Sequence, residues 1–155
     1  MFHENYPFFS SLSQGMLNHF KALSIEIKKK YLKKQSSLVI ELGCNDGIFL
    51  KNFKNYKHLG IEPSKNVAKQ ASKNGLNIIT KFFSYDLSKK ILNNYGNADL
   101  IYSANVMCHI PNINDVGKGI SNLLNDRGLL IFEDPYLGDV IDKTSFDQIY
   151  DEHVF

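Results

Sequence analysis

Apolar and polar positions alternate along this chain with two periods, one typical of helices and one typical of buried strands. Over residues 10–32 apolar side chains recur every three to five residues, which predicts an amphipathic helix. Residues 37–42 (SLVIEL) are a short apolar run just before a glycine, as expected of a buried strand. The same reasoning predicts helices at 45–53, 64–75, 86–96 and 112–126, and strands at 58–63, 76–83, 98–106 and 128–133.

Five strands separated by helices predict an α/β fold. Right-handed crossovers between consecutive strands give a mostly parallel sheet that helices cover on both faces. The length of 155 residues and the apolar content of 43% suit a single hydrophobic core. We interpret residues 1–36 as a helical lead-in and residues 37–155 as the sheet domain.

Composition and charge exclude several classes of protein. The net charge is +2, and the lysine-rich residues 28–34 fit the solvated face of a helix without a nucleic-acid motif. Cys44 and Cys108 are too few for a disulfide framework or a four-thiolate zinc site, so we expect two reduced, buried thiols and no metal. No apolar run approaches the roughly 18 residues of a membrane span, and no signal pattern opens the chain, which predicts a cytoplasmic protein.

Chemically informative residues follow the first two predicted strands. Glu41, Gly43, Asn45 and Gly47 surround the first turn, and Glu62 ends the second strand nineteen residues after Gly43. Ligands of open parallel sheets bind beyond the carboxyl ends of the strands, where an acid can accept hydrogen bonds from both hydroxyls of an adenosine ribose. The pattern predicts an adenosine-containing cofactor. The alternative is that the glycines only shape a tight turn and that Glu62 is an exposed strand-end acid.

The first turn does not fit a dinucleotide. In the G-x-G-x-x-G pattern that brings backbone amides to a pyrophosphate, Asn45 replaces the second glycine and Ile48 the third. Glu41 and Asp46 would oppose a pyrophosphate, whereas they suit the ammonium and sulfonium charges of S-adenosylmethionine. The spacing E-x-G-x-x-x-G resembles motif I of the class I methyltransferases, with Glu62 matching their ribose-binding acid. The resemblance implies S-adenosylmethionine, and not NAD, as the cofactor.

Further candidates follow the second, third and fourth strands. Pro63 and Asn105 join the predicted cofactor site. Phe82 and Phe83 end the third strand, where they either pack against adenine or belong to the core. His109 is either a substrate contact or a residue at a helix start, and the sequence leaves both readings open.

Longer segments resemble a narrower family. The segments GIEPSKNVAKQA, NVMCHI, EDPY and FDQIYDEHVF are similar to those of deoxysugar C-methyltransferases that act on nucleotide-linked 4-keto sugars, and ENYPFFSS is similar to the segment before their cofactor domain. The resemblance implies a Rossmann-like class I methyltransferase fold with strand order 3-2-1-4-5, here lacking the last two strands. It also implies a nucleotide-linked 4-keto sugar as the substrate.

The same resemblance implies roles for individual residues. His153 would be the base that removes the proton next to the ketone, Glu152 would orient or polarise it, and Tyr150 would lie near the sugar. Tyr6 and Tyr136 are implied as substrate contacts. The alternative for His153 is an ordinary surface histidine.

The chain matches only the central cofactor domain of that family's members. The resemblance implies that a complete member also has an N-terminal zinc-binding domain and a C-terminal domain that helps to hold the nucleotide sugar. We therefore expect a fragment or truncated reading frame that lacks sugar methyltransferase activity alone, with an exposed fifth-strand edge that favours self-association. Competing interpretations are a cofactor-binding domain without catalysis and a small-molecule O- or N-methyltransferase. The broken glycine pattern disfavours an NAD-linked oxidoreductase.

Overall fold

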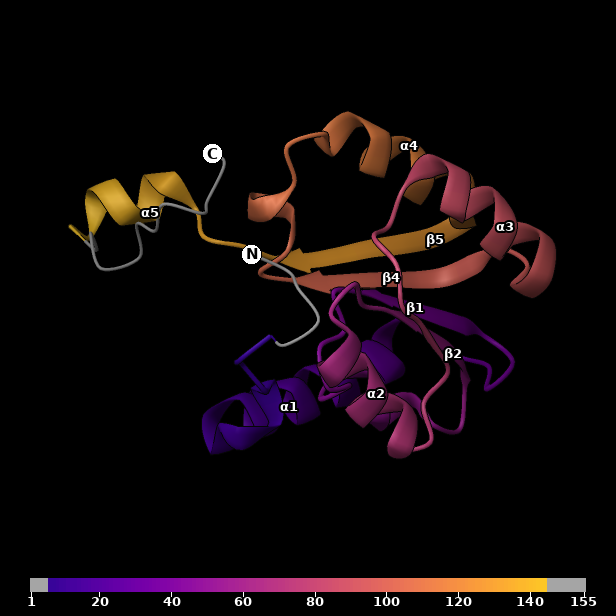
Figure 1. Ribbon diagram of the computed structural model, residues 1–155, viewed down its shortest axis with the longest axis horizontal. Coiled ribbons are helices and arrows are strands. Elements are labelled where there is room, and N and C mark those ends of the chain that lie inside the picture. The colour runs from indigo at the N-terminus through magenta and orange to yellow at the C-terminus, as the bar shows by residue number, and fades with distance from the viewer. Residues whose placement is uncertain (1–5, 145–155) are drawn as a thin grey trace.

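The computed structural model describes residues 6–144, which form a five-stranded sheet with helices on both faces (Figure 1). The strands are β1 (Leu38–Leu42), β2 (Lys57–Ile61), β3 (Ile78–Ile79), β4 (Ala98–Ala104) and β5 (Leu124–Glu133). They are arranged in the order β3-β2-β1-β4-β5, and every neighbouring pair is parallel. The predicted Rossmann-like α/β class and strand order are confirmed.

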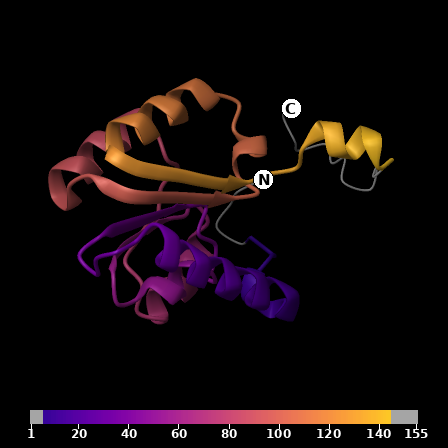
Figure 2. The ribbon, with the colours of Figure 1, turned by 180° about the vertical axis from the view of Figure 1, so that it is seen from behind.

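Helices cover the sheet from two sides (Figures 1 and 2). The α-helices are α1 (Gln14–Lys30), α2 (Lys65–Lys73), α3 (Tyr85–Tyr95), α4 (Ile113–Leu123) and α5 (Leu137–Asp142), and the 3-10 helices are η1 (Ser10–Leu12), η2 (Leu50–Phe53) and η3 (Met107–His109). The side chains of Ser13, Ser84 and Asn112 cap α1, α3 and α4 by accepting a hydrogen bond from a backbone N–H of the first turn. No helix within residues 6–144 is both long and apolar enough to cross a membrane.

Alternate residues of β1 serve two hydrophobic cores. Val39 points into the core beneath α1 and η2, whereas Ile40 belongs to the core beneath α3 and α4. Phe20 and Ile27 of α1 are buried in the first of these cores. The predicted lead-in therefore packs against the sheet as part of the same body.

An aromatic group fixes α1 over the sheet. The ring of Tyr102 on β4 stacks on Phe49 with centroids 3.8 Å apart, and it meets Phe20 edge-on at 6.2 Å. The Tyr102 hydroxyl donates to the Glu133 carboxylate, whose other oxygen lies 2.7 Å from Nε2 of His19. These contacts join α1 to the carboxyl ends of β4 and β5, beside the predicted site.

The helix predicted over residues 45–53 is wrong, because only the four residues of η2 are helical there. Asn45 (φ 49°) and Gly47 (φ 83°) both adopt left-handed backbone conformations, which a right-handed helix cannot contain. The third strand is also shorter than the predicted 76–83, since only two residues pair with β2. The fifth strand begins earlier than residue 128, and α5 was not predicted.

The strand β5 forms one border of the sheet within the described residues. Its side chains Leu130 and Phe132 are 38% and 57% exposed. The predicted exposed edge on the fifth strand is therefore present in this part of the chain. Self-association through that edge stays a prediction.

Candidate cofactor-binding site

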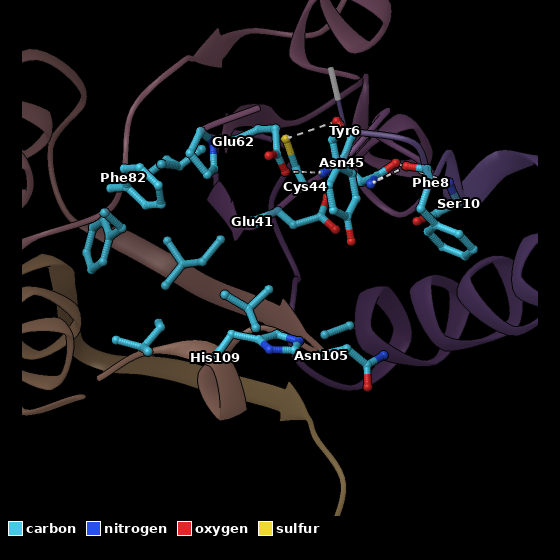
Figure 3. A pocket seen from close by; sticks show the side chains of 18 of the residues that line it. Tyr6, Phe8, Ser10, Glu41, Cys44, Asn45, Glu62, Phe82, Asn105 and His109 are labelled. Atoms are coloured by element: carbon cyan, nitrogen blue, oxygen red, sulfur yellow. Dashed lines mark hydrogen bonds between the residues drawn. The ribbon is translucent and has the colours of Figure 1, made fainter. Parts of the chain in front are cut away.

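A pocket of about 300 Å³ opens at the carboxyl ends of β1, β2 and β4 (Figure 3). Ten of the predicted site residues line it: Tyr6, Glu41, Gly43, Asn45, Glu62, Pro63, Phe82, Phe83, Asn105 and His109. Sequence reasoning missed several other lining residues, among them Phe8, Ser10, Met16, Phe20, Lys81, Ile110 and Val116. The sheet topology brings these segments together from distant parts of the sequence.

Glu62 lies directly after β2 and is buried, not exposed. Its Oε2 accepts a hydrogen bond from the backbone N–H of Asn45 at 2.9 Å, and its Oε1 accepts one from the N–H of Ser64 at 2.9 Å. Burial raises the pKa of Glu62, and the two backbone donors oppose this effect. Because each oxygen retains a second lone pair, the fixed carboxylate fits a pair of ribose hydroxyls.

A second buried acid lies at the end of β1. Glu41 accepts a hydrogen bond from the N–H of Leu50 at 3.1 Å. Burial raises the pKa of Glu41 well above its ordinary value, and the negative charges of Glu62 and Asp46 raise it further. The three acidic side chains surround one turn, where a cationic ligand would favour their ionised forms and a pyrophosphate would be opposed.

The two glycines of the first turn have different surroundings. Gly43 lines the pocket with φ 67°, and a Cβ atom there would lie 2.3 Å from Val106. Gly47 does not line the pocket, and its added Cβ would lie 2.2 Å from the side chain of Leu76. The visible role of Gly47 is therefore a left-handed turn packed against the core.

Aromatic side chains form the far end of the pocket. Phe82 is 65% exposed there, and Figure 3 shows it across the pocket from Phe8. Phe83 is partly buried and packs against the second core while it also lines the pocket. Phe83 thus belongs both to the core and to the pocket wall, whereas Phe82 presents its ring to the ligand side. This end fits a planar base such as adenine.

The segment after β4 supplies Asn105 and His109. The backbone N–H of Asn105 donates to the carbonyl oxygen of Glu133, and Asn105 adopts φ 53°. His109 ends η3, four residues before α4 begins, so it is not a residue at the start of α4. Figure 3 places both side chains on the side of the pocket opposite Glu62.

Some predicted residues are not brought to the pocket. Tyr136 lies outside the lining, is 70% exposed and precedes α5. Tyr150, Glu152 and His153 lie outside the described residues. The predicted catalytic roles of these three residues stay predictions.

The cysteines are free and buried, as predicted. Burial raises the pKa of Cys44 well above its ordinary value, and burial together with the Asp134 carboxylate raises that of Cys108 to about 12. Neither thiol is activated as a nucleophile. Within residues 6–144 no group of three His, Cys, Asp or Glu side chains is arranged to hold a metal ion.

Together the sheet order, the acid after β2 and the pocket beyond the strand ends define an α/β domain that binds a nucleoside-containing cofactor. Residues 17–154 match the family described as "Methyltransferase domain". This match covers most of the chain, so the chain belongs to that methyltransferase family.

Individual relatives agree with this assignment. The chain is 30% identical over 151 residues to the C-methyltransferase NovU of Streptomyces niveus, a match that covers 96% of this chain and 36% of that protein. The chain therefore spans about a third of the length of this curated relative.

Solved structures share the fold. The plantazolicin methyltransferase BpumL in complex with SAH superposes with a TM-score of 0.63 at 15% identity, over 88% of this chain and 52% of that one. A SAM-dependent methyltransferase from Anabaena variabilis superposes with a TM-score of 0.62 at 20% identity, over 86% and 58%. These structures show the shared fold, and the match to the methyltransferase family supports the prediction that S-adenosylmethionine is the cofactor.

Proposed function

We propose that this domain binds S-adenosylmethionine for a C-methyltransferase that acts on nucleotide-linked 4-keto sugars. The observation that carries the cofactor half of the proposal is Glu62, a buried acid at the end of β2 whose oxygens are fixed by two backbone donors inside the pocket. Support for the acceptor half comes from the sequence segments that resemble the sugar C-methyltransferases and from the similarity to a C-methyltransferase.

The residues of the pocket suit different parts of the cofactor. Glu62 would accept hydrogen bonds from the ribose hydroxyls, and Phe82 and Phe83 would pack against the adenine. Glu41 in the lining, and the buried Asp46 outside the lining, would favour the cationic methionine portion over a phosphate. When bound, S-adenosylmethionine supplies the methyl group, and the residues of this chain orient it and exclude water.

The part of the proposal that concerns the methyl acceptor, a 4-keto sugar, assigns proton removal to residues that are not in the pocket lining. Carbon next to a ketone becomes nucleophilic when a base removes its proton, and His153 would accept that proton while Glu152 orients the imidazole. Tyr6 and His109 line the pocket and would contact the sugar, and Tyr136 and Tyr150 are proposed as further contacts. An O- or N-methyltransferase has no need of a base for a carbon-bound proton.

Calorimetry with the purified chain tests the cofactor half. Titrations with S-adenosylmethionine and with S-adenosylhomocysteine (SAH) should each give one site, and NAD should give no heat of binding. Saturable NAD binding without binding of either methionine derivative would overturn the assignment.

Proton exchange tests the acceptor half. It requires only a bound ketone and a base, so it is less demanding than methyl transfer. In deuterated water, the SAH-loaded chain should bind a nucleotide-linked 4-keto-6-deoxy sugar and exchange the proton next to the ketone, which mass spectrometry detects. The 4-hydroxy sugar is the control. Exchange that persists in His153→Ala would remove His153 from the base role, and binding of the 4-hydroxy sugar without binding of the 4-keto sugar would contradict the substrate class.

A further inference from the structure

A short N-terminal segment, residues 6–11, is bound to the domain through side-chain amides. The backbone N–H of Tyr6 donates to Oδ1 of Asn66 at 3.1 Å, and Nδ2 of Asn66 donates to the carbonyl oxygen of Tyr6 at 2.7 Å. Asn66 is the second residue of α2, sixty positions along the chain. One side chain thus satisfies both backbone groups of Tyr6. We call residues 6–11 the N-terminal strap.

A second asparagine repeats this arrangement at the other end of the strap. Oδ1 of Asn45 accepts from the N–H of Ser10 at 3.1 Å, and Nδ2 of Asn45 donates to the carbonyl oxygen of Phe8 at 3.0 Å. The N–H of Ser11 donates to the neighbouring Asp46 carboxylate at 3.2 Å. The strap is therefore tied to the first turn of the cofactor site as well as to α2.

Asn45 also contacts the expected ribose acid. Its backbone N–H donates to Oε2 of Glu62 while its side chain binds the strap. A shift of this residue would therefore change the strap and the Glu62 carboxylate together. The left-handed conformation of Asn45, φ 49°, turns the backbone and the side chain toward these separate partners.

The strap is one wall of the pocket. Tyr6, Phe8 and Ser10 are lining residues, and Figure 3 shows them with Asn45 at the end of the pocket opposite Phe82. A cofactor anchored at Glu62 and directed away from Phe82 would pass beneath the strap. Holding the strap in place would therefore add contacts and exclude water on that side.

We propose that Asn45 and Asn66 are positioning residues that clamp the strap across the pocket and couple it to the bound cofactor. This inference rests on the proposed binding of S-adenosylmethionine and extends it to residues that act through the strap. Coupling is reciprocal, so a clamp that strengthens cofactor binding requires the cofactor to make the strap harder to open.

Two substitutions remove the clamps and keep the backbone groups around them. Asn45→Gly also removes the hydrogen bond that Oδ1 of Asn45 accepts from the N–H of Asp46 at 2.8 Å. Asn45→Gly keeps the backbone N–H that binds Glu62, and glycine adopts a positive φ without strain. Asn66→Ala lies in the first turn of α2, where alanine is a favourable helix residue. Asn94→Ala is the matched control, because Asn94 is exposed on α3 near the start of β4, at the end of that strand opposite the pocket.

Two measurements read out the clamp. The first is the dissociation constant for SAH, which should rise about 5- to 150-fold in each clamp variant, since the two neutral hydrogen bonds lost to the strap contribute roughly 1 to 3 kcal/mol. The second is amide hydrogen exchange of residues 6–11, which should slow on SAH binding in the wild type and be fast in both variants. Because both clamps hold the same strap, the double variant should bind SAH only slightly more weakly than either single variant.

The outcomes separate the clamp from the cofactor assignment. If the wild-type chain does not bind SAH, the proposed function fails, and exchange in the free chain still shows whether Asn45 and Asn66 hold the strap. Wild-type SAH affinity and wild-type exchange in both clamp variants would overturn the inference. Fully additive losses of affinity would overturn the shared clamp and indicate two independent local effects. The Asn94→Ala control should match the wild type in both measurements.

Discussion

Replacing Glu62 by glutamine tests the arrangement at the end of β2. The carboxylate accepts two backbone hydrogen bonds, from Asn45 and Ser64, each at 2.9 Å. A glutamine side chain offers only one oxygen, so one of these buried N–H groups would face another donor. An unsatisfied buried donor costs about 1 to 3 kcal/mol, and Glu62→Ala would leave both donors without this partner, at up to about twice that cost.

Burial offsets part of this loss. It raises the pKa of Glu62, so the ionised side chain destabilises the folded state at neutral pH, and either substitution removes that contribution. We therefore expect Glu62→Gln to lower the free energy of unfolding by no more than about 3 kcal/mol. The midpoint of thermal unfolding should shift by about 2 to 4 °C per kcal/mol.

Cofactor binding should respond more strongly than stability. Loss of one charge-assisted hydrogen bond to the ribose costs about 1.5 to 3 kcal/mol, which raises the SAH dissociation constant about 10- to 150-fold in Glu62→Gln. Glu62→Ala should bind still more weakly. Calorimetry measures the affinity, and thermal unfolding of the same samples measures the stability.

Glu26→Gln is the matched control for the loss of a carboxylate. Glu26 is exposed on α1 and pairs with Lys30, and exposed pairs contribute at most about 1 kcal/mol. It should retain wild-type SAH affinity. A folded Glu62→Ala protein with unchanged affinity would refute the reasoning and show that the ribose is held elsewhere.

Three further substitutions probe other features. Burial raises the pKa of Glu41 well above 4.5, so ionisation of this side chain lowers the stability of the wild type as pH rises above 4.5. Glu41→Gln should therefore have the higher free energy of unfolding at pH 7, measured in urea. This difference should vanish below about pH 4.5. Gly47→Ala should lower the free energy of unfolding by about 1 to 3 kcal/mol because the added Cβ meets Leu76. Calorimetry should show the SAH affinity of the wild type, and a weaker affinity in the folded variant would place Gly47 in the site. We expect the wild type to self-associate with rising concentration in sedimentation velocity, and Phe132→Lys to associate less. A wild type that stays monomeric at high concentration would contradict association through the β5 edge.

The sequence predicts β1 well because all five of its residues are buried, which produces an apolar run interrupted only by Glu41. The pattern over residues 45–53 misleads for a physical reason. Ile48, Phe49, Leu50 and Phe53 are all buried, so the helix-like spacing reflects real packing. The backbone conformations of the preceding turn, which the apolar pattern does not report, prevent a regular helix.

The acids of the site are predictable because their place at strand ends follows from chain order alone. The strap is different. Its anchors, Asn45 and Asn66, bind backbone groups of residues 35 to 60 positions away, and no spacing of residue types encodes such contacts. The available signal was the resemblance of ENYPFFSS to the segment before the cofactor domain of the sugar C-methyltransferases, and it implied a role for Tyr6 but not for Phe8 or Ser10.

The packing of Tyr102 provides an intrinsic spectroscopic probe. The chain contains eight tyrosines and no tryptophan, so tyrosine dominates its near-ultraviolet absorbance. Burial, reinforced by the hydrogen bond to Glu133, raises the pKa of Tyr102 far above its ordinary value of 10.0. In an alkaline titration, Tyr102 therefore forms tyrosinate late, only once the fold opens. The delayed tyrosinate absorbance therefore reports, without any label, when α1 and the strands beneath it separate.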